Sequence, residues 1–272
     1  MLTEEETKEL INQIIESKEW DKLAEVDVSC VKDFSHMFWT CYDIDSLEPL
    51  RNWDVSNGTN FSYMFHDCYN IKSLEPLYNW NVSNCTNFSY MFYGCHKILY
   101  LESLCNWDVS NGRCFSHMFD ECQNITSIEP LSNWNVSKGT DFSHMFERCY
   151  IKSLEPLRNW NVSKGKHFRK MFSYCKNITS LEPLSNWDVS KGIDFSEMFS
   201  SCCNILNLNG LENWNVSNGK DFDQMFSWCG NIKSLEKIAN WNISEDANTD
   251  RMIWLPELSI PQISICKCHE TN

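Results

Sequence analysis

The chain has 272 residues, a formal net charge of −14 at pH 7 and 14% aromatic residues, with only 9 glycines and 7 prolines. Scarce glycine and proline together with many aromatic residues exclude a disordered or collagen-like chain. The negative charge argues against nucleic acid or an anionic membrane surface as a partner, because both attract clustered lysine and arginine. No stretch approaches the about 20 consecutive apolar residues of a membrane span.

Residues 1–25 are predicted to form an N-terminal capping helix. Thr3 and Glu6 have the spacing of a capping box. The apolar stripe of this helix consists of Leu10, Ile11, Ile14 and Ile15. The first six residues include three glutamates and no basic residue, and no apolar stretch follows them, unlike a secretory signal. We therefore expect an intracellular, cytoplasmic protein with reduced thiols.

A repeat of about 27 residues occupies residues 26–252. Tryptophan recurs every 27 residues, with one interval of 26, and a methionine follows each of these tryptophans by 11 positions. The tryptophans are Trp53, Trp80, Trp107, Trp134, Trp160, Trp187, Trp214 and Trp241. Such a period is typical of a solenoid. We expect about eight full repeats and a partial last one, stacked around one continuous core.

Each repeat is predicted to contain one short helix and one short strand, which makes an α/β solenoid similar to a leucine-rich repeat. The apolar positions of 88–95 stand at i, i+3, i+4 and i+7, the spacing of one helix face. The residues at these positions are Phe88, Met91, Phe92 and Cys95. Residues 104–109 have the apolar spacing of a leucine-rich-repeat strand, which we place at 107–109.

After Met252 the repeat register is lost, and residues 253–272 are predicted to form a C-terminal cap and tail. Cys266, Cys268 and His269 are ligand-type residues near the chain end. A short terminal segment with three such residues is weak evidence for a metal site, so we interpret it as an ordinary tail.

The segment from Trp80 to Cys95, with Trp-Asn-Val-Ser followed by Met-Phe and Cys, resembles the BspA-like leucine-rich repeat family. That family occurs on bacterial and mycoplasma surfaces and in giant DNA viruses of amoebae. The resemblance implies a solenoid used in recognition, without catalytic residues to carry over. Glycine replaces the usual apolar residue after the serine in most copies, as at Gly58, Gly139 and Gly219. Surface-anchoring signals are absent, which favours an intracellular or virus-encoded member, located in the host-cell cytoplasm or the virion.

Cysteine recurs at the last position of the predicted helix stripe. The members are Cys41, Cys68, Cys95, Cys122, Cys149, Cys175, Cys202 and Cys229. Neighbouring helices pack about 8–10 Å apart, too far for a ladder of disulfides. No Cys-x-x-Cys pair occurs to suggest a metal site. We therefore expect these cysteines to be reduced, buried, small apolar residues.

Histidine shares one slot of the repeat, directly before the methionine, at His36, His117 and His144. A stacked pair of histidines in adjacent repeats could hold a metal ion or respond to pH. The same slot also holds Tyr63 and Lys170, so we interpret it as a solvent-facing helical position. No cofactor or metal is expected.

Two polar ladders are candidate partner-binding surfaces. The acidic ladder, from the recurring Leu-Glu-Pro-Leu, comprises Glu48, Glu75, Glu102, Glu129, Glu155, Glu182 and Glu236. The second ladder flanks the predicted strand and includes Asn79, Asn81, Ser83, Asn106, Asp108 and Ser110. Stacked amides and hydroxyls can satisfy one another along a sheet, and a row of carboxylates can be a solvated edge, so both also have purely structural interpretations.

The sequence favours a non-enzymatic, monomeric scaffold that binds a protein partner, and the acidic ladder favours a basic one. A uniform row of carboxylates lacks the contrasting environments that separate an acid from a base in catalysis. The alternative is a structural or self-assembling component, for example of a virus particle.

Overall fold

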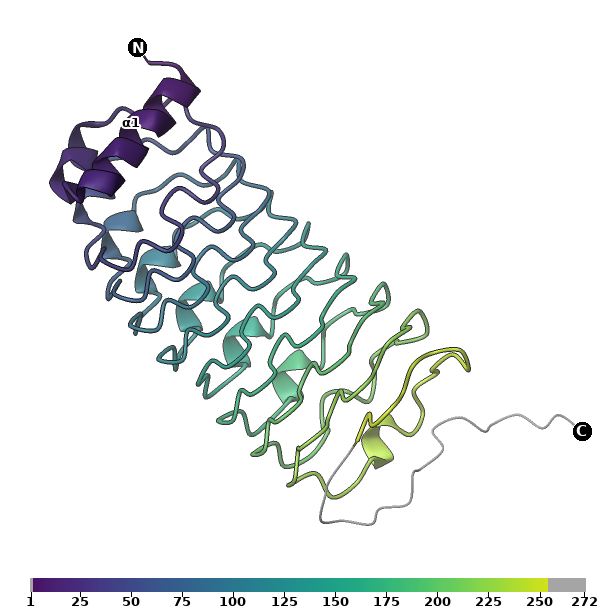
Figure 1. The fold of residues 1–272 in the computed structure, drawn as a ribbon. Helices are drawn as coiled ribbons and strands as arrows, with labels where there is room; N and C mark the ends of the chain where they lie inside the picture. Colours follow the sequence, from purple (N-terminus) through teal and green to yellow (C-terminus); the bar gives the residue numbers. More distant parts are fainter. Residues whose placement is uncertain (1, 254–272) are drawn as a thin grey trace, which may run out of the picture.

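The protein is a solenoid of similar coils stacked side by side, as seen in a computed structural model that describes residues 2–253 (Figure 1). Helix α1, Glu4–Ser17, lies against the first coil and covers it. The predicted capping box is confirmed, because the Glu6 N–H donates to the Thr3 hydroxyl and the Thr3 N–H donates to the Glu6 carboxylate. Ile11 and Ile14 are buried. The predicted C-terminal cap and the Cys266–His269 cluster lie almost entirely outside the described residues.

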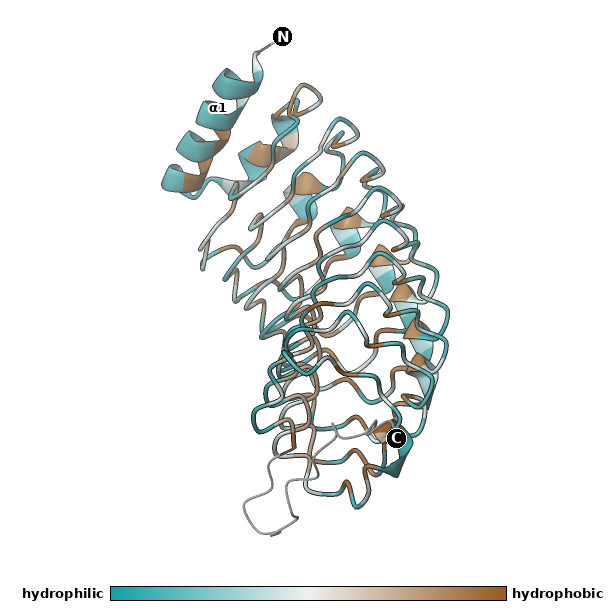
Figure 2. Cartoon of the chain, turned by 90° about the vertical axis from the view of Figure 1, so that its right-hand side faces the viewer, coloured by the Kyte–Doolittle hydropathy of each residue, from teal (hydrophilic) through white to brown (hydrophobic). Residues whose placement is uncertain are grey.

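Short 3₁₀ turns mark one edge of the array. Their bounds are η1 Trp20–Glu25, η2 Glu48–Leu50, η3 Glu75–Leu77, η4 Glu102–Leu104, η5 Glu129–Leu131, η6 Glu155–Leu157, η7 Glu182–Leu184 and η8 Glu236–Ile238. In η3 the Ser73 hydroxyl accepts from the Glu75 N–H, and proline follows where no N–H is needed. The Tyr78 N–H then donates to the Glu75 carbonyl and ends the turn. These turns lie on the outer side of a bent array (Figure 2).

The helix predicted over 88–95 is wrong, because this segment is a run of consecutive tight turns. Tyr90 and Gly94 have φ of 58° and 70°, values that an α-helix cannot contain. The inward positions form two pairs, Phe88 with Phe92 and Met91 with Cys95, and the members of each pair are four residues apart. Over eight residues, a period of four cannot be distinguished from the 3.6-residue period of a helix. An isolated helix of this length is also unstable, because the free-energy cost of nucleation exceeds the stabilisation from so few hydrogen bonds.

Adjacent coils are joined by a backbone ladder along the turn segment. The N–H groups of Phe88, Tyr90, Phe92 and Gly94 donate to the next coil at 2.8–3.0 Å, while the intervening N–H groups close the turns. Parallel pairing is confined to single residues, such as Cys114 with Asp141, on coil after coil. The strand predicted at 107–109 is wrong: the described residues there have no strand pairing, and the ladder runs through the neighbouring turn segment instead.

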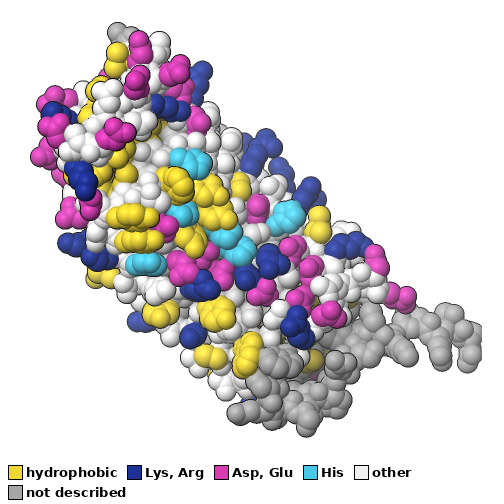
Figure 3. Space-filling model, viewed as in Figure 1, with side chains coloured by type: hydrophobic (Ala, Val, Ile, Leu, Met, Phe, Trp, Pro, Cys, Tyr) yellow, Lys and Arg dark blue, Asp and Glu magenta, His cyan; other side chains and the backbone are white. Residues whose placement is uncertain are grey.

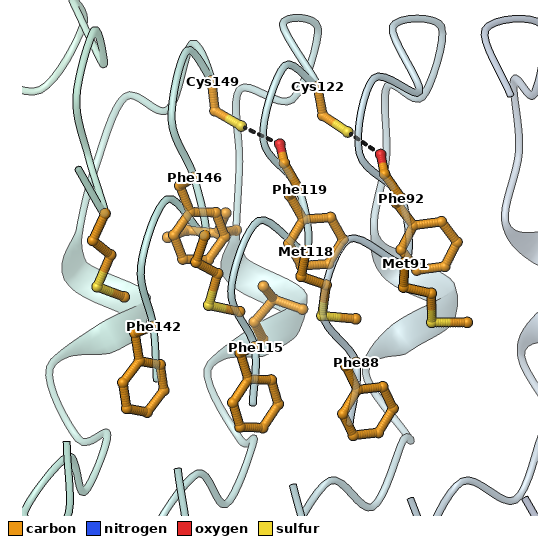
Figure 4. Close-up of a cluster of buried hydrophobic side chains, with 14 of the residues drawn as sticks. Phe88, Met91, Phe92, Phe115, Met118, Phe119, Cys122, Phe142, Phe146 and Cys149 are labelled. Atoms are coloured by element: carbon orange, nitrogen blue, oxygen red, sulfur yellow. Dashed lines mark hydrogen bonds between the residues drawn. The ribbon is translucent and has the colours of Figure 1, made fainter. Parts of the chain in front are cut away.

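Aromatic rings fill the interior in rows. Figure 4 shows Phe88, Phe115 and Phe142 side by side on successive coils, and the ring centroids of Phe115 and Phe142 are 5.6 Å apart. Gly139 makes room for this row, because a Cβ there would lie 2.3 Å from the Phe142 ring. Trp134 is only 4% exposed, and its indole N–H donates to the Leu104 carbonyl of the preceding coil at 2.9 Å. The tryptophan series is therefore both core and cross-coil donor.

The cysteine series is buried from Cys68 onward, as predicted, and it also links coils. The Cys122 thiol donates to the Phe92 carbonyl at 3.0 Å, and Cys149 donates likewise to Phe119 (Figure 4). Burial raises the pKa of both thiols. The cysteines of the described residues are free thiols, although Cys41 at the first coil is only partly buried.

The described part of the chain contains no helix that is long and apolar enough to cross a membrane.

Thiol accessibility should follow burial in the folded protein. We expect alkylating reagents to modify Cys105 and Cys203 rapidly, because both are exposed, and to leave Cys95, Cys122 and Cys175 unmodified until unfolding. Mass spectrometry of peptides before and after denaturation measures this. Rapid native labelling of the buried set would contradict the arrangement of the core.

Truncation of a mid-array tryptophan should be costly. Trp134→Ala should lower the free energy of unfolding by about 3–5 kcal/mol through lost burial. Trp134→Phe removes the indole N–H that donates to the Leu104 carbonyl, but this carbonyl keeps the Trp107 N–H as a donor, so only about 0.5–1.5 kcal/mol is expected. Urea unfolding measures the total, and hydrogen exchange should show the loss in adjacent coils. A cost of Trp134→Ala below about 1 kcal/mol would show that Trp134 is not core.

Candidate functional site

The acidic ladder is an exposed edge formed by the first residues of the 3₁₀ turns η2 to η8. All seven predicted glutamates are exposed, and each begins one of these turns. Arg51 bridges Glu48 and Glu75, and Arg158 pairs with Glu155. The hydrogen bonds from Arg51 lower the pKa of Glu48 and of Glu75. Arginine side chains thus offset part of the repulsion.

The second predicted ladder is local turn structure. Asn81 accepts the N–H of Ser83 at 3.1 Å, and Asp108 accepts that of Ser110 at 3.0 Å. The bond that crosses between coils comes instead from Asn111, whose amide donates to the Ser83 carbonyl at 2.7 Å. Asn79, Asn81, Asn106 and Asp108 are exposed, and Ser83 and Ser110 are half-buried. The structure therefore assigns Asn81 and Asp108 a role in closing turns.

A third surface, which the sequence reasoning missed, lies over the turn segments of the N-terminal half. Figure 3 looks onto it, with histidine and large hydrophobic side chains gathered beside acidic ones. We call it the aromatic face, and it consists of His36, Trp39, Tyr42, Tyr63, His66, Tyr69, Tyr90, Tyr93, His96, His117 and His144. Because the coils repeat, equivalent slots form columns along the array.

The first column of the aromatic face is a continuous stack of five rings. Successive centroids from His36 through Tyr63, Tyr90 and His117 to His144 are 4.6, 4.4, 4.0 and 3.9 Å apart. This spacing is close to the about 4.8 Å between adjacent strands, because the backbone ladder holds the coils at that distance. The slot read as a solvent-facing helical position is therefore a rigid row of half-buried and exposed rings.

Two further columns widen this face and carry its most exposed rings. Trp39 and His66 belong to one of them, and Tyr42 and Tyr69 belong to the other, with centroids 5.1 Å apart. Trp39 is 52% exposed and Tyr42 is 49% exposed. Exposed aromatic side chains with few rotatable bonds are enriched at protein interfaces.

At the inner end of the face, two adjacent coils each place a histidine against a buried acid. His117 Nδ1 lies 2.9 Å from Asp120 Oδ2, and His144 Nδ1 lies 2.6 Å from Glu147 Oε2. Asp120 and Glu147 are only 3% and 4% exposed. Asp120 Oδ1 is buried and has no hydrogen-bond partner. The four side chains form a compact polar cluster in an otherwise aromatic surface.

The electrostatics of this cluster follow from burial. Burial, and next the negative charge of Glu147, raise the pKa of Asp120 to about 8. Burial lowers the pKa of His117 to about 4, since the charged ring loses more hydration than the neutral one. Burial opposes ionisation of Glu147, but the hydrogen bond and charge of His144 outweigh it and lower the pKa of Glu147. Burial thus favours a neutral His117 and a protonated Asp120, whereas the contact with His144 favours the ionised form of Glu147.

The sequence contained a signal for both features. The positions directly before methionine and directly after the Met-Phe pair hold tyrosine, tryptophan or histidine in the first three copies, as at Tyr90 and Tyr93. They change together to histidine and acid in the next two copies, His117 with Asp120 and His144 with Glu147. The histidine and the acid are recognisable as a pair only when both positions are compared across the repeats.

A search of curated proteins finds no match. The structure is similar to that of an internalin from Listeria monocytogenes, at 11% sequence identity and a TM-score of 0.26, with 81% of this chain and 82% of that chain covered.

The profile of one sequence family matches three successive stretches, residues 7–101, 97–181 and 150–257. Together these stretches span nearly the whole array, and they agree with the resemblance to BspA-like leucine-rich repeats. The chain belongs to this family, which is described as "Mycoplasma protein of unknown function, DUF285".

Proposed function

We propose that the protein is a non-enzymatic scaffold that binds a protein partner through its aromatic face. The observation that carries the proposal is the stack of five rings from His36 to His144, flanked by the exposed rings of Trp39 and Tyr42. A solenoid is generally suited to this role, because it presents a long and regular surface. Catalysis is not part of the proposal.

The physical advantage of this face is preorganisation. Tyr63 and Tyr90 are held by ring stacking on both sides, with centroid distances between 4.0 and 4.6 Å, so little side-chain entropy remains to be lost on binding. Tryptophan and tyrosine dominate the residues that carry most of the binding energy in protein interfaces. Trp39 and Tyr42 are the exposed anchors at this face.

The acidic ladder has a different role in the proposal. A net charge of −14 attracts a basic partner over distances of about 8–10 Å at moderate ionic strength. Exposed charges of this kind mainly increase the rate of association, whereas buried contacts set the rate of dissociation. We propose that the glutamates steer a basic protein toward the aromatic face.

Removal of the exposed anchors should release the partner. Trp39→Ser combined with Tyr42→Ser should weaken binding by about 30-fold or more, the effect of a hot-spot loss of about 2 kcal/mol. Affinity capture from the native cell with mass spectrometry identifies the partners, and titration of a captured partner measures the affinity. Tyr100→Ser is the matched control, because Tyr100 is 68% exposed but lies outside the aromatic face.

Three outcomes distinguish the alternatives. Equal capture by the double variant and the parent protein would contradict the assignment of the face. Concentration-dependent sedimentation of the parent protein that the double variant abolishes would favour the structural, self-assembling alternative. Reproducible turnover of a substrate, lost on a point mutation, would contradict a non-enzymatic role.

Neutralising part of the acidic ladder should change the association rate alone. Glu102→Gln combined with Glu129→Gln should slow association with a basic partner and weaken its salt dependence, while the dissociation rate stays unchanged. Both glutamates are exposed, so folding should be unaffected. Kinetic binding measurements at low and high salt test this. An increased dissociation rate would instead place the acidic ladder within the interface.

A further inference from the structure

We propose that His117, Asp120 and His144 form a binding site for a divalent transition-metal ion of the Zn²⁺ class that joins two adjacent coils. One ligand atom from each of these side chains lies within 4.8 Å of the others. Two imidazoles and a carboxylate are a ligand set suited to Zn²⁺ and related ions. The inference concerns the free protein and does not depend on the proposed partner.

The spacing is close to that of a loaded site. Zn²⁺ binds nitrogen and carboxylate oxygen at about 2.0–2.2 Å, so ligand atoms around one tetrahedral ion lie about 3.5 Å apart. Ligand atoms that are now up to 4.8 Å apart would have to approach one another by up to about 1.3 Å. The side chains of His117 and His144 are 18% and 16% exposed, so an ion can reach both rings from solvent.

The unpaired oxygen of Asp120 is the second observation that points to a ligand. Its side chain is 5% exposed, and Oδ1 has no hydrogen-bond partner although it is shielded from water. A buried carboxyl oxygen without a partner costs stability, and a bound cation would satisfy it.

Glu147 is a positioning residue for this site. Its carboxylate lies 2.6 Å from His144 Nδ1 and is itself 5% exposed, so it restricts the orientation of the ring. A buried carboxylate also adds negative charge beside the ion. Acids that orient a ligating histidine are a regular part of metal sites.

The site is confined to two coils of the array. In the same two slots the preceding coil has Tyr90 and Tyr93, and the following coil has Lys170 and Ser173. The ammonium of Lys170 lies 3.3 Å from Glu197, which partly neutralises its charge. The three ligands come from two coils. A Zn²⁺ ion with three protein ligands completes its coordination with water.

Calorimetric titration of the full chain with ZnCl₂ tests the site. Cys266, Cys268 and His269 are first changed to Ser, Ser and Gln, so that the tail contributes no ligands. His117→Gln, Asp120→Asn and His144→Gln should each weaken binding by more than about 100-fold, since loss of an outer partner alone costs about 10–100-fold. Glu147→Gln should fall in that lower range.

His36→Gln is the matched control, because His36 occupies the same slot but is followed by Trp39 where the site has an acid. It should leave Zn²⁺ affinity unchanged. Zn²⁺ should also raise the melting temperature of the parent protein and of His36→Gln, but not of the ligand variants. Should a Gln variant fail to fold, His144→Tyr introduces the ring type that the array accepts in the same position at Tyr90, and it should still abolish the site.

A crystal structure with Zn²⁺ provides the direct observation, through an anomalous peak between His117 and His144. Equal Zn²⁺ affinity in the parent protein and the three ligand variants would overturn the proposal. An anomalous peak confined to the exposed thiols of Cys105 or Cys203 would overturn it as well, since the titrated ion would then be bound by surface cysteines.

Discussion

The backbone ladder between turn segments is the interaction on which the rest of the structure depends. In each coil, alternate N–H groups donate to the next coil and the remaining ones close tight turns, so nearly every donor of the segment is satisfied. Left-handed residues such as Tyr90 are unfavourable in isolation, at a cost of about 1–3 kcal/mol, and persist because bonds on both sides determine them. The ladder brings residues 26 or 27 positions apart into contact.

Once the ladder sets the coil spacing, the interior follows. Equivalent phenylalanines stack, and the polar atoms that the core requires become links between coils. The Trp134 indole and the Cys122 thiol each donate to a carbonyl of the preceding coil that already accepts a backbone N–H within its own coil. These bonds satisfy the buried side-chain donors and add a link between coils. Apolar burial and hydrogen bonding are thus supplied by the same few residue types in every repeat.

The same spacing determines what the surface can do. Equivalent outward-facing positions of successive coils form a column of side chains. The chemistry of a column changes only where successive repeats have different residues at that position. Tyr63 and Tyr90 make an aromatic column, while His117 and His144 continue it and bring two buried acids with them. A local substitution in two neighbouring repeats therefore creates a polar cluster without disturbing the array.

The sequence by itself determined the repeat, the capping box at Thr3, the core positions and the family, because period and apolar spacing depend only on residue order. It did not determine the turn conformation at 88–95, since eight residues cannot separate a four-residue period from a helical one. It did not show that Arg51 joins two glutamates, that Trp134 donates to the preceding coil, or that Asp120 lies beside two histidines. Those contacts join residues of neighbouring coils, and only the tertiary structure decides how far apart and in which register adjacent coils pack.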